Sequence, residues 1–553
     1  IPQYKRKYFV TFAVYSLSKI ATKHLFKLNN RTSMKYTKLA FALMITLHLT
    51  ACDEGSQGLK GPQGASGTNS LINHDALTLG HEECFFGGLK VTSGLDSNSD
   101  NILADSEVIT TSTNCNANPI TSSGSSLPYS VMRADIENGA MPGNLMEIRN
   151  GGFGSDMVAH PTEPTQFYAL TDRGPNATFT GDQGKGKKFP TPDYTPRIGL
   201  FELQDNGDVK KIKDILLKRP DGTEITGLPN TAALGGTGET PYDADGNVIL
   251  QDMNLPFDET TNPIKLDDYG LDGEGLVALS DGTFWVSDEY GPHMVHFNAA
   301  GVEIGRINAF ADDTRNTFIL PAEFAKRRAN RGMEGLTITP DETTLVGIMQ
   351  STIYNPSSAV KVNNIVRIVT INLTNGAVSQ YLYKQEKAQN SQSGIVALSS
   401  TEFVVIERDG SFYNKDTSAM KHLYRIDISN ATDIETISTN TNLTQDSALG
   451  LLIDGKTLEE VTLDADGWST IESAGIQTIS KTLLVDLVAE TGYPHDKLEG
   501  MWLINDSTIG VLNDDDFATW ASGGVLEQKY LDAGQTNIDG NRLYIIEGLD
   551  LAL

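Results

Sequence analysis

The clearest pattern of apolar and polar positions along the chain lies between residues 272 and 292. Two short apolar runs flank the turn sequence Ser280-Asp281-Gly282-Thr283, which predicts two antiparallel strands joined by a tight turn. Carboxylates stand at both open ends of this hairpin, namely Asp272, Glu274, Asp288 and Glu289. Because a hairpin places its two open ends side by side, we expect these acidic groups to converge at one edge of the sheet.

The same unit recurs along the sequence. Further copies contain Glu334-Gly335 and Glu499-Gly500, and weaker copies contain Ser393-Gly394 and Gly154-Ser155. Short strands that repeat at a spacing near sixty residues are typical of a β-propeller. We therefore expect residues 129–553 to form a single propeller of five to seven blades, with six favoured.

Closure of this ring needs strands from both ends of the propeller. We expect the C-terminal strand 543–546 to pair with a strand near 131–136 or 145–149, since an open ring would leave exposed edges. Two stretches, 255–268 and 438–482, have the composition of insertions.

Residues 34–52 have the composition of an export signal: two lysines, an apolar run, and the tetrad Leu49-Thr50-Ala51-Cys52. The tetrad resembles a bacterial lipobox, which implies that Cys52 is lipidated and anchors the protein to a membrane. Residues 1–33 are then an upstream extension, and the protein is expected in the bacterial cell envelope, periplasmic or surface-exposed. An ordinary signal peptide with an incidental cysteine is the alternative.

Residues 53–70 contain a glycine at every third position from Gly58 to Gly67. This Gly-X-Y tract is too short for a stable triple helix, so we expect a flexible tether. Residues 119–128 are rich in Ser and Pro and predict a second linker.

Residues 71–118 are expected to form a small β module between these linkers. Apart from Cys52, Cys84 and Cys115 are the only cysteines, and an exported compartment permits a disulfide between them. The loop 96–107 matches a twelve-residue calcium loop with the ligands Asp96, Asn98, Asp100, the Ile102 carbonyl and Glu107. Strand-like flanks argue against a helix-loop-helix hand, and a chance acidic loop is the alternative. Tether, cysteine pair and loop together resemble small modules that follow the lipobox in bacterial surface lipoproteins.

The charge of the chain limits its partners. The first 51 residues contain nine basic and no acidic residues, so the remainder carries 34 basic against 71 acidic residues. Such a surface repels nucleic acid and anionic membranes, and it suits bound divalent cations.

The repeats at 272–292, 330–351 and 497–517, together with Thr171-Asp-Arg-Gly-Pro175, resemble the bacterial phytase-like family named for esterase-like activity. The resemblance covers roughly residues 145–548. It implies an all-β propeller that hydrolyses phosphoesters or other small-molecule esters, by analogy to calcium-dependent phytases.

Metal-assisted phosphoester hydrolysis needs carboxylates for calcium or another divalent metal, cations for the phosphate, and an activated water. The strand ends supply both kinds of residue, and we expect them at one mouth of the central channel. The expected catalytic residues are Glu274, Glu334 and Arg331. The expected metal ligands in the propeller are Asp288, Glu289, Glu499 and Asp514. The expected substrate-binding residues are Arg173, Arg408, His293 and Lys497.

Other interpretations stay open at this point. Carboxylates at strand ends also cap neighbouring backbone N–H groups, and the arginines can simply neutralise them. A non-catalytic surface propeller that binds a ligand or protein, with structural calcium, is therefore the main alternative. A lactonase-like propeller with one channel-bound metal is a weaker one. A serine triad has little support, since no Gly-x-Ser-x-Gly elbow stands out and Ser287 beside Asp288 is no better than chance.

Overall fold

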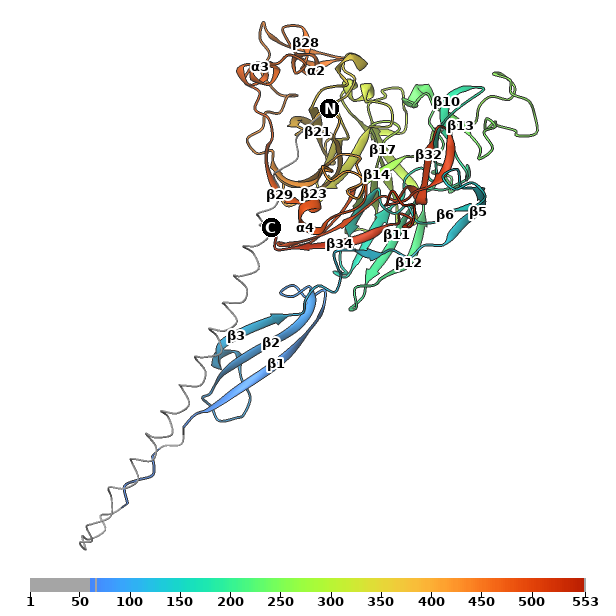
Figure 1. Cartoon of the computed structure of the whole chain (residues 1–553). Helices are drawn as coiled ribbons and strands as arrows, with labels where there is room; N and C mark the ends of the chain where they lie inside the picture. The colour runs from blue at the N-terminus through green and yellow to red at the C-terminus, as the bar shows by residue number, and fades with distance from the viewer. Residues whose placement is uncertain (1–59, 65–66, 552–553) are drawn as a thin grey trace, which may run out of the picture. The chain divides into compact units, whose positions relative to one another are not determined.

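A computed structural model describes residues 60–64 and 67–551 (Figure 1). The chain divides into two units, Ile1–Thr68 and Asn69–Leu553, and the elements below belong to the second. The export signal at 34–52, the lipidated Cys52 and the extension 1–33 lie outside the described residues, as does most of the tether. None of the described helices is long and apolar enough to cross a membrane.

The first module is a three-stranded antiparallel sheet in the order β1 (Asn69–Leu79), β2 (Phe86–Asp96) and β3 (Val108–Cys115). A disulfide joins Cys84 and Cys115, whose Cα atoms are 5.2 Å apart, so the predicted pairing is confirmed. The acidic loop joins β2 to β3 through the 3₁₀ helix η1 (Asp105–Glu107), and strands flank it as expected.

Five larger sheets of four or five strands follow along the chain. The first consists of β7 (Asp156–Ala159), β8 (Gln166–Leu170), β11 (Arg197–Leu203) and β12 (Val209–Leu216). The second consists of β14 (Gly273–Ala278), β15 (Phe284–Asp288), β16 (His293–Phe297), β17 (Glu303–Asn308) and β18 (Asn316–Ile319). The third consists of β19 (Met333–Ile338), β20 (Thr344–Met349), β21 (Ile365–Asn372) and β22 (Val378–Lys384).

The fourth sheet consists of β23 (Ser391–Ala397), β24 (Glu402–Arg408), β25 (Lys421–Asp427) and β29 (Ser480–Asp486). The fifth consists of β30 (Gly500–Asn505), β31 (Thr508–Leu512), β34 (Arg542–Glu547) and β4 (Ser125–Ser126). Except for the parallel β18, neighbouring strands in these sheets are antiparallel. The predicted hairpins are therefore present as the first two strands of each sheet.

The first strands of the five sheets contact one another in the order β7, β14, β19, β23, β30 and back to β7. Apolar side chains fill the spaces between consecutive sheets, including the fifth and the first, where the rings of Trp502 and Phe167 lie 5.0 Å apart. Central strands such as β20 are buried on both faces, because each sheet has a neighbour on either side. The protein is thus nearly all-β with a propeller-like arrangement. Five such sheets lie in the described residues, and the favoured number of six blades is not confirmed.

The strand that pairs with the C-terminal strand β34 is not one of the two that we expected. The C-terminal strand β34 pairs with the two-residue strand β4, through Arg542 with Ser126 and Leu543 with Ser125. The strands that we expected there, β5 (Val131–Glu137) and β6 (Leu145–Arg149), pair with each other instead. The linker predicted at 119–128 therefore contains an edge strand of the fifth sheet, which covers the free edge of β34.

Several elements lie outside the five sheets. β9 (Ala177–Gly181), β10 (Gly184–Lys188) and β13 (Thr240–Tyr242) form a small sheet that contacts the hairpin of β32 (Thr519–Ser522) and β33 (Val525–Gln528) (Figure 1). We call these two elements the roof. The insertion predicted at 438–482 contains β26 (Leu443–Asp446), β27 (Gly450–Ile453), β28 (Lys456–Thr457), α2 (Leu458–Val461) and α3 (Gly467–Ser473), and its end enters β29. The remaining short helices are η2 (Ala232–Leu234), η3 (Ala322–Lys326), η4 (Ser358–Val360), α4 (Leu487–Thr491) and η5 (Asp516–Ala518).

Candidate functional site

A β-bulge explains how the repeated Glu-Gly pairs are presented. In the second sheet Gly273 pairs with Asp288 and Gly275 pairs with Ser287, so Glu274 is left out of the strand ladder. The pairing skips Glu334 and Ser393 in the same way in the next two sheets. A bulge leaves one residue unpaired and redirects its side chain, and the carboxylate of Glu274 lines a cavity.

This cavity has a volume of about 380 Å³ and lies between the starts of the inner strands and the roof. We call it the carboxylate cavity. Its acidic lining residues are Asp172, Asp272, Glu274, Glu289, Asp496 and Asp516. Its basic lining residues are Arg173, Lys187, Arg408 and Lys497. Of the residues that we expected at one mouth of the channel, the cavity is lined by Glu274, Glu289, Arg173, Arg408 and Lys497.

A first acidic group consists of Asp272, Glu274 and Glu289, each of which offers an oxygen within 4.8 Å of the others. Burial raises the pKa of Glu274 well above its usual value, and the nearby Glu334 and Glu499 raise it further. Burial, together with Asp272, raises the pKa of Glu289 to about 7. Without a cation, Glu274 and Glu289 retain protons more readily than free carboxyl groups, because they are desolvated and lie close to other carboxylates.

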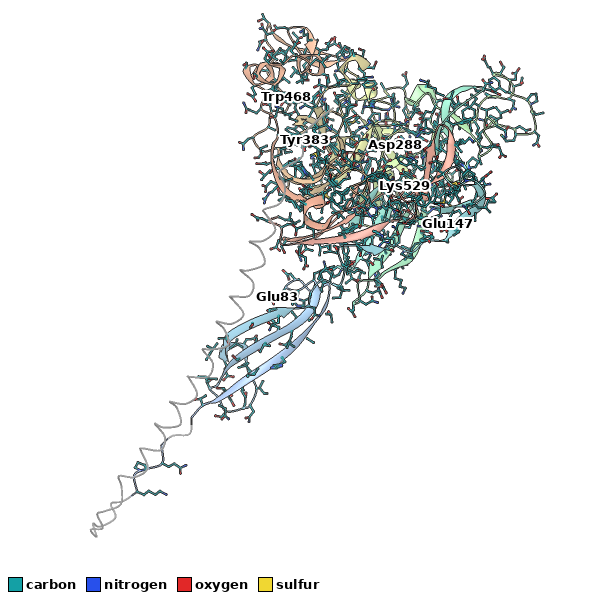
Figure 2. All side chains as sticks on the ribbon, in the orientation of Figure 1. Glu83, Glu147, Asp288, Tyr383, Trp468 and Lys529 are labelled. Carbon is teal, nitrogen blue, oxygen red and sulfur yellow. A yellow bond between two sulfur atoms is a disulfide. The ribbon has the colours of Figure 1, made fainter. Side chains whose placement is uncertain are left out.

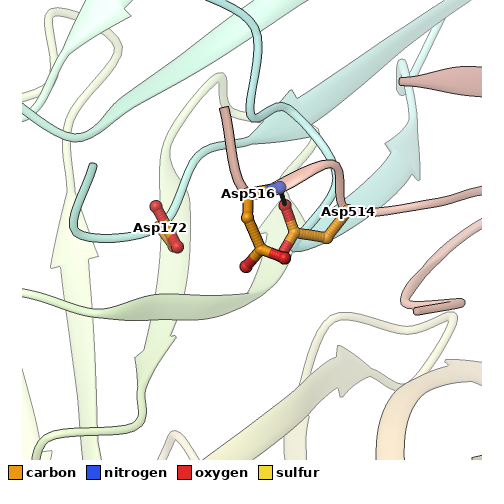
Figure 3. Close-up of side chains that lie close together, drawn as sticks. All are labelled: Asp172, Asp514 and Asp516. Atoms are coloured by element: carbon orange, nitrogen blue, oxygen red, sulfur yellow. Dashed lines mark hydrogen bonds between the residues drawn. The ribbon is translucent and has the colours of Figure 1, made fainter. Parts of the chain in front are cut away.

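A second acidic group consists of Asp172, Asp514 and Asp516 (Figure 3), with oxygens again within 4.8 Å. The backbone N–H of Asp516 donates to Asp514 Oδ1 at 2.9 Å. Burial raises the pKa of Asp514 to about 8. Burial opposes the ionisation of Asp516, but Lys497 and Lys529 hold the pKa of this carboxyl below its usual value. Lys497 Nζ lies 2.7 Å and Lys529 Nζ 2.6 Å from the Asp516 carboxylate (Lys529 is labelled in Figure 2).

An unusual backbone turn brings Asp514 and Asp516 to the same side. Asp516, Phe517 and Ala518 have φ of 49°, 57° and 60°, which is the left-handed region. Each such non-glycine residue costs on the order of 1–3 kcal/mol. The Asp515 side chain accepts the N–H of Phe517 at 3.0 Å, and the Phe517 ring is fully buried against Tyr194. These contacts hold the strained turn in place.

The first acidic group fits a divalent cation as it stands, whereas a cation in the second group would have to displace Lys497, which pairs with both Asp514 and Asp516. Hard cations such as calcium prefer carboxylate oxygens, and each group brings three of them together. Oδ2 of the buried Asp272 accepts no hydrogen bond from the described residues, although Arg173 Nη1 lies 3.1 Å from it. A bound cation would complete the coordination of this oxygen and remove the repulsion that raises the pKa values.

Three of the four basic residues of the cavity have acidic partners. Arg173 lies 3.1 Å from Asp272 and 3.6 Å from Glu239, Arg408 pairs with Glu499, and Lys497 pairs with Asp516. Lys187 on β10 makes no ion pair or side-chain hydrogen bond with residues 60–64 or 67–551. Burial and the neighbouring Arg173 lower the pKa of Lys187. An anion bound beside Lys187 would favour its charged ammonium form, since no ion pair within the described residues occupies this side chain.

The structure places the other predicted residues around or away from the cavity. Glu334 and Glu499 are buried behind Glu274, and their Oε2 atoms lack a hydrogen-bond donor in the described part of the chain. Arg331 donates to Ser391 Oγ at 3.2 Å, and Glu289 and Glu334 are close enough to influence its pKa.

Asp288 and His293 do not reach the cavity. Asp288 accepts backbone N–H groups of Asp272 at 2.7 Å and Gly291 at 3.0 Å, so it caps the hairpin rather than facing a metal. His293 is buried against Phe310, and burial together with Arg306 lowers its pKa well below the usual value. The structure therefore gives no support to Asp288 as a metal ligand or to His293 as a substrate-binding residue.

Ser287 is not arranged as a nucleophile. Its hydroxyl is fully buried and donates to the Glu334 carbonyl at 3.4 Å. No histidine of the described residues makes a hydrogen bond to it. The environment of Ser287 therefore adds no support for a serine triad, for which the sequence also gave little support.

The predicted calcium loop is closed by its own hydrogen bonds. Asp96 accepts the N–H groups of Asp100 and Asn101 at 3.1 and 3.0 Å, and Glu107 accepts that of Ser97 at 2.9 Å. Asn101 has φ of 62°, in the left-handed region. The occupancy of this loop by calcium stays a prediction.

Sequence reasoning missed Lys187, Asp496, Lys529 and Glu239. Lys187 lies on a roof strand outside the repeats, in the stretch Gly-Lys-Gly-Lys-Lys. Lys529 follows the roof hairpin and lies 2.9 Å from Asp496. Repeat alignment identifies only residues that recur from sheet to sheet, so it carried no signal for these four.

Comparison with known proteins gives one similar curated protein and several solved structures with weak similarity. An "Uncharacterized secreted protein" of Arthroderma benhamiae is 28% identical over 263 residues, which cover 39% of this chain and 48% of that protein. The chain thus spans about half the length of this relative. The PQQ-bound aldose sugar dehydrogenase of Streptomyces coelicolor is 8% identical with a TM-score of 0.26, covering 87% of this chain and 99% of that one. A streptogramin B lyase is 12% identical with a TM-score of 0.24, covering 65% and 90%. TM-scores this low do not support any inference about the function of this chain.

Family comparison is more informative. Residues 69–115, the first module, match a domain of unknown function, DUF7151. Residues 148–517, which make up more than half of the chain and include both acidic groups, match the family described as "Phytase-like: Esterase-like activity of phytase". The chain therefore belongs to the phytase-like family.

Proposed function

We propose that this protein is an exported, metal-dependent hydrolase of phosphoesters, with its active site in the carboxylate cavity. The observation that carries the proposal is the pair of three-carboxylate groups in or beside one cavity that also holds Arg173, Lys187 and Arg408. Phosphate recognition needs this combination of metal ligands and cations. Carboxylate esters are the second substrate class, because the family name includes esterase-like activity. We also infer that the five sheets are the blades of one closed ring.

The two acidic groups would each hold a divalent cation, with calcium as the first candidate. A cation bound there would polarise a phosphoryl oxygen and lower the pKa of a coordinated water. Lys187 would bind a non-bridging oxygen of the phosphate, because its side chain has no carboxylate partner among the described residues. Arg173 is already held by Asp272 and Glu239, and it would orient the same phosphate with its remaining N–H groups.

Hydrolysis of a panel of phosphate and carboxylate esters, with added calcium and with a chelator, tests this proposal. We expect phosphoester turnover with calcium and its loss in chelator. Lys187→Gln should lower kcat/KM by about 10- to 100-fold, because a charge-assisted hydrogen bond to the phosphate is lost. Lys188→Gln is the matched control: this neighbour lies 4.6 Å over the Phe179 ring and does not line the cavity. No turnover of any ester under either condition would reject the hydrolase.

A non-catalytic binding propeller is the alternative. The ion pairs of Arg408 with Glu499 and of Lys497 with Asp516 favour it, because they neutralise part of the acidic charge without metal. On this alternative the cavity binds anions, yet turnover is absent with every metal tried.

Membrane anchoring through Cys52 is a separate part of the proposal. It is supported by the lipobox-like tetrad, whereas the secreted relative supports export alone, and it predicts that Cys52→Ser releases the protein from membrane fractions. Unchanged membrane association of this variant would contradict it.

The last part of the proposal is that calcium binds the loop of the first module and stabilises it. Calcium should raise the melting temperature of the module in the intact protein through Asp96, Asn98, Asp100, the Ile102 carbonyl and Glu107. Differential scanning calorimetry of wild type and Asp96→Asn, with and without calcium, tests this. An equal calcium shift in both proteins would contradict the site.

A further inference from the structure

A second, smaller pocket of about 170 Å³ adjoins the carboxylate cavity, and we call it the ring pocket. Trp520 of β32 lines both spaces. Lys529 also connects them, because it lines the ring pocket while its Nζ lies 2.6 Å from the carboxylate of Asp516 in the cavity. The Trp520 ring therefore borders both spaces, and a ligand bound in the cavity lies next to it.

Trp520 is the exposed aromatic side chain of this pocket, whereas Phe412 is buried. Trp520 is 42% exposed, whereas Trp285 and Trp502 are only 5% and 1% exposed. The Trp520 ring lies 6.2 Å from the Phe412 ring, and with Tyr530 three aromatic residues border the same small space. A dry cavity of about 150 Å³ holds one benzene molecule, which makes the ring pocket large enough for a single six-membered ring.

The charges of the ring pocket disfavour an anionic occupant. Lys529 is neutralised by Asp496 at 2.9 Å and Asp516 at 2.6 Å. The remaining charged lining residues are Lys415, Glu527 and Asp532. The backbone N–H of Asn537 is the main group that lowers the pKa of Asp532, so this carboxylate is ionised at neutral pH. One cation thus faces two carboxylates, and a ring that carries further phosphates would be repelled.

We propose that the ring pocket is the leaving-group subsite of this enzyme, and that its substrates are phosphate monoesters of an uncharged six-membered ring alcohol or phenol. The phosphate lies among the cations of the carboxylate cavity, and the ring packs against Trp520. In hydrolysis the bond from phosphorus to the ring oxygen breaks and a water oxygen bonds to phosphorus. The leaving ring oxygen takes up a proton from that water. The subsite rests on the proposed function, and it places highly phosphorylated rings among the poorer substrates.

Calorimetric titration with two non-hydrolysable ligands tests the subsite in the whole protein with calcium present. Phenylphosphonate and methylphosphonate carry the same anionic group and differ in the ring. We expect phenylphosphonate to bind the wild type about 10-fold more tightly, which corresponds to about 1.4 kcal/mol, because its ring is buried and pairs with an aromatic side chain. Trp520→Ala should remove most of this preference. Trp520→Phe, which keeps an aromatic face, should retain most of it.

Equal affinities of the two ligands for the wild type would overturn the subsite, and so would an equal loss of both affinities in Trp520→Ala. The subsite is also rejected if neither ligand binds. Turnover of 4-nitrophenyl phosphate separates this inference from the proposed function. Turnover without a ring preference rejects only the subsite, whereas a ring preference that depends on Trp520 without turnover rejects only the hydrolase.

Discussion

Glu274 and Asp288 occupy the two open ends of one hairpin, and their surroundings differ completely. Glu274 is left out of the ladder by a bulge and lines the carboxylate cavity. Asp288 is fully buried and accepts two backbone N–H groups, and burial raises its pKa to about 8. One carboxylate is available to a ligand, and the other stabilises the hairpin.

Substitution of these two residues should therefore separate function from stability. Glu274→Gln should abolish calcium-dependent hydrolysis and weaken calcium binding at least about 10-fold, with little change in melting temperature. Asp288→Asn replaces an acceptor oxygen with a donor, and it should cost about 1–3 kcal/mol of unfolding free energy while calcium binding persists. Calorimetry and chemical denaturation of both variants measure this contrast. Full activity of Glu274→Gln would contradict the assignment.

The sequence predicted part of this residue-scale picture. The recurrence of Glu-Gly in three hairpins correctly indicated that Glu274, Glu334 and Glu499 come close together. Asp288 and Glu289 are adjacent in the sequence, and only the three-dimensional structure shows which carboxylate faces the cavity. Composition cannot make that distinction, since capping and metal binding use the same side chains.

At the scale of elements, the glycine after each bulge lets the inner strands approach closely. A Cβ on Gly275 would lie 2.6 Å from the backbone nitrogen of Leu336 in the next sheet. A Cβ on Gly394 would lie 2.5 Å from the carbonyl of Glu499, and one on Gly500 would lie 3.0 Å from the nitrogen of Met157. The repeated glycine is thus required for close packing between consecutive sheets, whereas the residue before it varies, being Ser393 before Gly394 and a glutamate before Gly275 and Gly500.

Gly275→Ala should accordingly be more harmful than an ordinary glycine substitution. We expect a loss of about 2–3 kcal/mol in unfolding free energy, because backbone of two sheets must move apart. Gly282→Ala in the turn of the same hairpin is the matched control. Gly282 has φ of +85°, but the nearest atom to an added Cβ is 3.9 Å away, so only about 1 kcal/mol of backbone strain is expected. Urea denaturation compares the two, and equal losses would contradict the packing argument.

The element scale also shows where sequence prediction ends. The hairpins could be predicted because their apolar runs and turns are local features. Ring closure by Ser125 and Ser126 could not, since a two-residue polar strand has no pattern and its pairing depends on β34 more than 400 residues away. The roof strand with Lys187 has no counterpart in the repeats and gave no signal either.

At the scale of the whole molecule, acidic charge is concentrated in a buried region. The pKa values of Glu289 and Asp514 are raised to about 7 and 8 in the absence of metal. The folded protein therefore binds these protons more tightly than the unfolded chain, whose carboxyl groups titrate near about pH 4. Unfolding free energy consequently falls as pH rises from about 4 to about 8, because the folded state must lose stabilising protons or bury charge.

Bound metal should abolish this fall of the unfolding free energy with rising pH. In chelator, the melting temperature is expected to fall by at least a few degrees between pH 5 and pH 8. With calcium the decline should disappear, since calcium binds the ionised carboxylates of the folded state and stabilises it by about 2.7 kcal/mol at 100 times its Kd. Scanning calorimetry over this pH range measures both curves. Parallel curves with and without calcium would mean that metal does not bind at these carboxylates.

The most direct test of the central claim is the location of bound metal in crystals of this protein soaked with manganese, which scatters X-rays anomalously. The account predicts anomalous difference density among Asp272, Glu274 and Glu289, and a second peak among Asp172, Asp514 and Asp516. Density at neither group, in crystals where manganese is bound elsewhere or nowhere, would contradict a metal-dependent active site in the carboxylate cavity.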